Sequence, residues 1–185
     1  MSEEKSLSEE KSRAEEKSRA AAWKVSSAVA KEQDNQEDTV EWQQILFSAT
    51  QEVMETMFFS TVIGEAADGL AIGDSHTAQL TFRGNPSGIF CVSVSRVSAR
   101  QIAANFIGAE DPDKLTANQI EDVVGEMANM LCGSVLSGVR TGAHFDLTHP
   151  RLLQDLAEPP AGAISSHLEL EDGIITSWLK ILDGN

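Results

Sequence analysis

The stretch Glu121–Ser137, EDVVGEMANMLCGSVLS, decides the fold prediction because it has the pattern of a long amphipathic helix. Its apolar residues recur in steps of four, three, four and four, which is the spacing of one buried helical face. This stripe begins with Ile120, the residue just before the stretch, and continues with Val124, Met127, Leu131 and Val135. Thr116 and Gln119 form a T-x-x-Q capping box just before it, which predicts the start of the helix.

The opposite face of this helix has an unusual composition. At 100° per residue, the positions turned away from the stripe are Asp122, Gly125, Glu126, Asn129, Gly133 and Leu136. Glycine inside a helix costs about 1 kcal/mol relative to alanine, so this face gives up local stability. Two explanations stay open. The glycines either admit a neighbouring element of the same chain, or they let a partner approach Glu126 and Asn129, which project side by side.

The remaining segments predict the other layers of the domain. Residues 42–58 have helical periodicity, and residues 98–107 are expected to form a short helix that ends at Gly108. Two β-hairpins are expected, one around the Asn-Pro turn in 77–95 and one around EDG in 164–182, with a loop over 148–163. The sequence therefore predicts an α+β domain with two long helices packed on a mostly antiparallel sheet of roughly four to six strands.

The chain divides by composition near residue 38. Residues 1–38 contain a six-residue repeat, EEKSLS, EEKSRA, EEKSRA, which matches neither a helical stripe nor a strand. We interpret this segment as a disordered, charged N-terminal tail. Trp23 is the one side chain in it that offers an anchor for docking on another surface. Residues 39–185 are predicted to form the folded domain.

Charge and composition exclude several classes of partner. The net charge is −15, and most of it lies after residue 38, which disfavours nucleic acid and anionic membrane surfaces. No apolar run is long enough for a membrane span. Cys91 and Cys132 lie in apolar surroundings without metal-ligand spacing, and the four histidines are scattered, so we expect free thiols, no metal site and a cytoplasmic location.

The long helix resembles a known family. EDVVGEMANMLCGSVLS and the preceding FIGAEDPDKLTANQ (106–119) resemble the signature region of the CheX-like chemotaxis phosphatases, whose relatives include CheC and FliY. ILFSATQEVMETMF (45–58) and the closing hairpin resemble the family less sharply, so the resemblance covers most of 42–182. The family's E-x-x-N pattern is matched by Glu126 and Asn129. The helix over 42–58 has EVME with no Asn at the third step, so one site per chain is expected.

The resemblance implies a substrate and a mechanism. The substrate would be the aspartyl phosphate of a CheY-like response regulator, with Asn129 orienting the attacking water and Glu126 pairing with the receiver's lysine. Mg²⁺ would be bound by the receiver, and no cofactor by this chain. From helix geometry we assign docking roles to Asp122, Gly125 and Gly133. Family relatives form dimers, and the short strands TAQLTFRG (77–84) and IFCVSVS (89–95) are expected to pair as sheet edges in a homodimer.

Two other function classes are considered. In the first, the domain is a non-catalytic module that binds a receiver or a flagellar switch protein. In the second, the domain is an oligomerisation element and the tail is its working part. An Asn129 side chain facing the core would favour the binding module. Deletion of residues 1–38 would test the hypothesis of an oligomerisation element with a working tail, because an enzyme should keep its turnover without the tail.

Overall fold

The computed structural model describes residues 39–66, 74–139, 144–153 and 158–182. The predicted tail and its repeat lie outside these residues. The chain divides into two units, and the sheet and its helices belong to the unit Trp42–Asn185.

Helices form where the sequence predicts them. Residues 39–57 are helical, and they are followed by α2 (Arg96–Ile107), the short 3-10 helix η1 (Pro112–Lys114) and α3 (Ala117–Val139). Gly108 ends α2 in the left-handed region, with φ 75°. The capping box of α3 is confirmed, because the Thr116 backbone N donates to Gln119 Oε1 at 2.9 Å and the Gln119 N donates to Thr116 Oγ1 at 3.3 Å.

The described strands form one seven-stranded sheet. They are β1 (Val62–Glu65), β2 (Ser75–Arg83), β3 (Ser87–Ser95), β4 (Asp146–Leu147), β5 (Arg151–Leu153), β6 (Ile164–Leu170) and β7 (Gly173–Leu182). The strand order is β1-β6-β7-β3-β2-β4, with β5 also paired to β2, and every pairing is antiparallel. Both predicted hairpins, β2–β3 and β6–β7, are confirmed.

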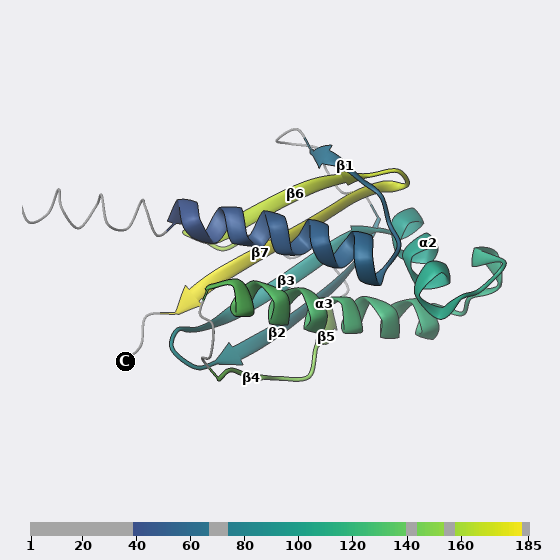
Figure 1. Cartoon of the computed structure of the whole chain (residues 1–185). Coiled ribbons are helices and arrows are strands. Elements are labelled where there is room, and N and C mark those ends of the chain that lie inside the picture. Colours follow the sequence, from purple (N-terminus) through teal and green to yellow (C-terminus); the bar gives the residue numbers. More distant parts are fainter. Residues whose placement is uncertain (1–38, 67–73, 140–143, 154–157, 183–185) are drawn as a thin grey trace, which may run out of the picture. The chain divides into compact units, whose positions relative to one another are not determined.

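The two long helices cover one face of the sheet, where they lie side by side (Figure 1). The core between the layers contains residues from each of them, including Leu46, Met54, Phe58, Leu80, Phe90, Val92, Met127, Leu131, Leu168 and Leu179. All five residues of the predicted stripe are buried. The predicted fold class, two long helices on an antiparallel sheet, is therefore confirmed.

Two apolar side chains lie on the opposite side from the one expected. Leu136 is only 2% exposed, although the helical wheel placed it outward. The cause is the 39–57 helix, which lies against the C-terminal part of α3, where a Cβ added at Gly138 would be 2.9 Å from Ile45 Cγ2. Met57, expected in the buried stripe, lies at the last helical position and is 44% exposed.

The sheet corrects two further predictions. β2 and β3, which were expected at sheet edges, lie inside the sheet, because β7 pairs with β3 and both β4 and β5 pair with β2. The stretch 148–163, expected as a loop, contains β5. A three-residue strand is too short to show alternation, and its pairing depends on the backbone of a distant strand.

Candidate active site

The outward face of α3 presents the polar residues that the sequence singled out. Asp122 and Glu126 are exposed, and Gly125, Asn129 and Gly133 are half-buried. Val124, Met127 and Leu131 on the other side of the helix are buried in the core. Asn129 therefore does not face the core. A core-facing Asn129 would have favoured the non-catalytic binding module, so this argument for the module does not apply.

Glu126 and Asn129 contact each other. Asn129 Nδ2 donates to Glu126 Oε2 at 3.4 Å, because residues three apart on a helix are neighbours on its surface. This distance is at the long end for a hydrogen bond, so the contact is weak. Both side chains are therefore available to exchange this contact for stronger ones with a partner.

The glycines of this face do not serve packing within the described chain. A Cβ added at Gly133 would have no heavy atom within 4 Å, and one at Gly125 would meet only Pro150 Cβ at 3.9 Å, an ordinary contact. By contrast, a Cβ at Gly138 would lie 2.9 Å from Ile45, and one at Gly88 would lie 2.5 Å from the Lys180 carbonyl oxygen. Of the two explanations left open by the sequence, the described residues therefore favour the approach of a partner.

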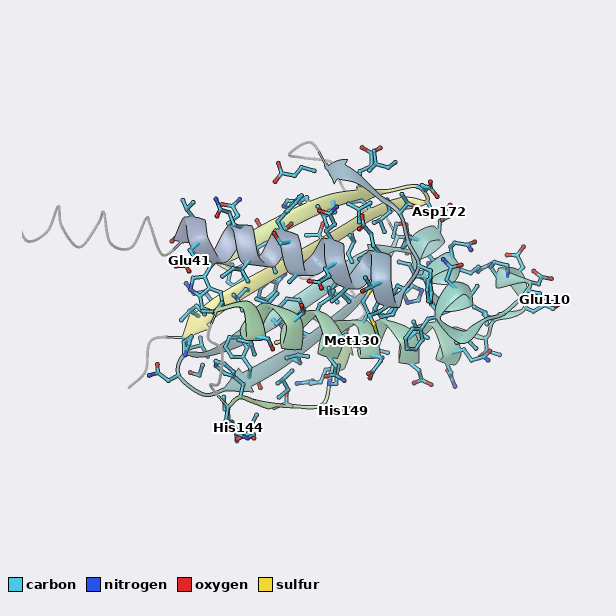
Figure 2. All side chains as sticks on the ribbon, viewed as in Figure 1. Glu41, Glu110, Met130, His144, His149 and Asp172 are labelled. Carbon is cyan, nitrogen blue, oxygen red and sulfur yellow. The ribbon has the colours of Figure 1, made fainter. Side chains whose placement is uncertain are left out.

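A small hollow of about 130 Å³ lies against this helix face. One wall comes from α3, with Glu121, Asp122, Gly125, Glu126 and Asn129. The other wall comes from the segment between β4 and β5 and from β5 itself, with His149, Pro150 and Leu152. Figure 2 shows His149 next to α3, below the helix in that view. Asn129 thus lies at the edge of a concave site.

The second wall was missed by sequence reasoning. His149 was considered only as a metal ligand, and Pro150 and Leu152 were assigned to a loop. The wall is held in place by Thr148, whose hydroxyl accepts from the Thr81 backbone N at 3.0 Å. In addition, the Thr148 N donates to the Thr81 carbonyl oxygen at 2.9 Å. No local pattern reports this link, since the two threonines are far apart in the sequence.

The α3 wall is acidic. Glu121, Asp122 and Glu126 line the hollow, and none of them forms an ion pair with another described residue. The hollow therefore complements a partner that carries a positive charge.

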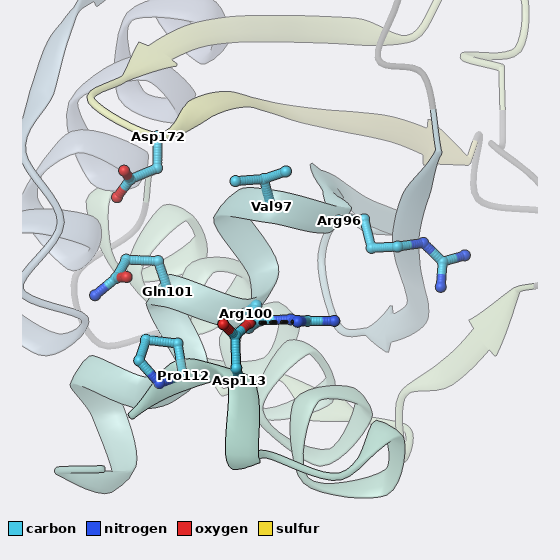
Figure 3. Close-up of a pocket in the computed structure, with 7 residues that line it drawn as sticks. All are labelled: Arg96, Val97, Arg100, Gln101, Pro112, Asp113 and Asp172. Carbon is cyan, nitrogen blue, oxygen red and sulfur yellow. Dashed lines mark hydrogen bonds and ion pairs between the residues drawn. The ribbon is translucent and has the colours of Figure 1, made fainter. Parts of the chain in front are cut away.

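A larger hollow, of about 460 Å³, lies elsewhere, around α2 and η1 (Figure 3). Its two arginines are engaged in exposed ion pairs: Arg96 Nε lies 3.0 Å from Asp74 Oδ2, and Arg100 Nη1 lies 2.7 Å from Asp113 Oδ1. The rest of its lining consists of Val97, Gln101, Pro112 and Asp172. These paired charges suggest a solvated surface, so size alone does not make this hollow the site.

Other chemistries have little support in the described part of the chain. No group of three or more His, Cys, Asp or Glu side chains there is placed to hold a metal ion. Both cysteines are buried and free, as predicted, and burial raises the pKa of each thiol to about 12. His76 is half-buried beside Arg96, and burial and that guanidinium lower the pKa of the imidazole. No described helix is both long enough and apolar enough to cross a membrane.

Comparisons with known proteins agree with the fold. Residues 76–159 match the family model described as chemotaxis phosphatase CheX, and this range includes Glu126 and Asn129. A chemotaxis protein CheX from Desulfovibrio desulfuricans is 18% identical with a TM-score of 0.61, covering 77% of this chain and 99% of that one. A CheC-like superfamily protein from Shewanella sp. PV-4 is 20% identical with a TM-score of 0.62, covering 78% and 99%.

A chain of the CheX–CheY–BeF₃–Mg²⁺ complex from Borrelia burgdorferi is 19% identical with a TM-score of 0.60, covering 76% of this chain and 97% of that one. A search of curated proteins found no match. The resemblance to the CheX-like chemotaxis phosphatases is thus confirmed, and the fold is that of the CheX and CheC structures.

Proposed function

We propose that this CheX-like protein is a phosphatase that hydrolyses the aspartyl phosphate of a CheY-like response regulator. The observation that carries the proposal is the Glu126–Asn129 pair on the outward face of α3. A carboxylate and an amide are presented together at a concave surface, next to helix glycines for which the described chain has no packing need. The solved complex that contains a CheX and a CheY supports the class of partner.

The chemistry needs positioning more than acid or base catalysis. An acyl phosphate is reactive, so the catalyst has to hold a water in line with phosphorus while positive charge stabilises the phosphoryl oxygens. In this proposal the Asn129 amide orients the water, since it both accepts and donates hydrogen bonds and does not repel the phosphoryl group. Mg²⁺ is assigned to the receiver domain, as part of the substrate.

Glu126 fixes the register of the complex in this proposal by pairing with the receiver's active-site lysine. The contact between Asn129 Nδ2 and Glu126 Oε2 is weak, at 3.4 Å, so the receiver's lysine can displace the amide from the carboxylate. When the lysine takes up the Glu126 carboxylate, the Asn129 amide is released toward the water. Gly125 and Gly133 allow the close approach, and Asp122 adds negative charge to the docking face.

The homodimer and the cytoplasmic location expected from the sequence belong to this proposal. The pairing edge, however, has to change, because β2 and β3 are interior. β1 is the outermost described strand on the β6 side, so it is the better candidate for pairing between copies. The boundary between tail and domain near residue 38 also stays a prediction.

The test is the loss of radiolabel from a phosphorylated CheY-type receiver domain with catalytic amounts of protein. We expect the wild type to accelerate dephosphorylation and Asn129→Ala to reduce the rate about a hundredfold, because the water is no longer oriented. Glu126→Ala should also lower the rate, and it should weaken the complex with the receiver because the pairing with the receiver's lysine is lost. Asn118→Ala, an exposed asparagine on the same helix but outside the hollow, is the matched control and should leave the rate unchanged.

The proposal is wrong if the wild type leaves the lifetime of the acyl phosphate unchanged. If the wild type binds the receiver without shortening that lifetime, the binding module replaces the enzyme. Equal activity of Asn129→Ala and wild type would remove the water-orienting role.

A further inference from the structure

The second wall of the hollow is built from a part of the chain remote from the E-x-x-N pattern. Leu152 in β5 pairs with Ala78 of β2, a buried residue of the core. Leu152 lines the hollow, and 42% of it is exposed. An apolar side chain therefore stands across the hollow from Glu126 and Asn129.

This wall has a fixed position relative to α3. The Thr148–Thr81 hydrogen bonds anchor the start of the segment to β2, and the backbone of β5 is paired to the same strand. Pro150 lies next to Gly125, within ordinary contact distance of where a Cβ would stand. A partner that brings its surface onto Asn129 thus meets a preformed wall, which costs little conformational entropy on binding.

The two walls differ in chemistry. The α3 wall contributes the carboxylates of Glu121, Asp122 and Glu126, and the opposite wall contributes the apolar side chains of Pro150 and Leu152 beside the imidazole of His149. A partner surface that fits both walls carries a lysine or arginine next to an aliphatic or aromatic side chain. The long stem of the basic residue packs on the apolar wall while its charge stays near the carboxylates of α3.

We propose that Leu152 is a specificity-determining contact for the receiver domain. It takes up an apolar side chain of the receiver beside a basic one that Glu121 and Asp122 attract. The inference rests on the proposed function, since it assigns the partner's docking chemistry at the same site. Leu152 does not contact the reacting atoms, so it acts on affinity and not on the chemical step.

The experiment measures turnover and binding separately. The rate of dephosphorylation as a function of receiver concentration gives KM and kcat, and titration of CheY activated with BeF₃ and Mg²⁺ gives Kd. We expect Leu152→Thr to raise KM and Kd about fivefold with kcat unchanged, as expected when the burial of part of a leucine is lost. Threonine keeps β-propensity, so β5 is preserved. Leu152→Met should recover most of the affinity.

Leu182→Thr is the matched control. Leu182 is 44% exposed, close to the 42% of Leu152, and it also lies in a strand, but it is not part of the hollow. Its substitution should change neither KM nor Kd.

Each outcome separates the inference from the proposed function. If wild type turns over the receiver and Leu152→Thr has unchanged KM and Kd, the role of Leu152 is wrong and the phosphatase proposal stands. If kcat falls in Leu152→Thr and Kd does not change, the residue is structural and the inference is overturned. If the wild type neither binds nor dephosphorylates the receiver, the proposed function fails, and this inference fails with it.

Discussion

Replacing Gly133 with alanine separates the stability of α3 from its proposed use. The residue lies in the interior of a 23-residue helix, and a Cβ added there would meet no described heavy atom within 4 Å. The new methyl group should therefore bring the helix-propensity gain without a steric penalty. This gain is about 1 kcal/mol in the free energy of unfolding.

Two measurements follow from this estimate. For a domain of this size, 1 kcal/mol corresponds to a rise in Tm of about 2–4 °C, which thermal unfolding followed by circular dichroism detects. If a receiver's backbone approaches Gly133, the same methyl group is an obstacle in the complex. Overpacking costs about 1–3 kcal/mol, so kcat/KM for receiver dephosphorylation should fall about fivefold to a hundredfold. The expected variant is thus more stable and less active.

Gly138→Ala is the control on the same helix. Its Cβ would stand 2.9 Å from Ile45 Cγ2, so the Ile45 side chain or its helix has to shift and the gain in Tm should be absent. A Gly133→Ala protein that is more stable and fully active would show that no partner approaches this position. A less stable Gly133→Ala protein would show that the glycine is needed within the chain, and either result refutes the reasoning.

Two further predictions concern the fold. Thr116→Ala should lower the free energy of unfolding by about 1 kcal/mol through loss of the capping box, whereas Thr116→Ser should not; equal Tm values for all three proteins would contradict this. Cys91 and Cys132 should resist thiol reagents near pH 8 in the native protein and react after unfolding, because their pKa values are about 12. Between pH 9 and 12 the unfolded chain loses these thiol protons and the native protein keeps them, so stability should fall as pH rises through that window; stability independent of pH there would contradict the burial of the thiols.

The helices could be predicted because their signals are local. The stripe of α3, its capping box and the glycine that ends α2 each depend on residues within one or two turns. The two long hairpins are equally local, since each joins strands adjacent in the sequence. The order of the strands was not predictable in this way, and β2 and β3 were wrongly placed at sheet edges.

The candidate site also combines residues that local signals predict with residues that only the tertiary structure places. Helical geometry by itself placed Glu126, Asn129, Asp122, Gly125 and Gly133 on one face, because one turn of helix fixes which side chains are neighbours. Leu136 departed from this scheme, since its burial depends on where the 39–57 helix packs.

The sequence alone therefore determined the two helices, the hairpins and the polar face of α3, because these follow from interactions between residues close in the chain. Only the tertiary structure decided that this face borders a hollow. His149, Pro150 and Leu152 reach α3 through backbone pairing of β5 with β2 and through the Thr148–Thr81 hydrogen bonds. Such pairing depends on backbone groups that every residue shares, and it joins segments about seventy residues apart, so side-chain periodicity does not report it.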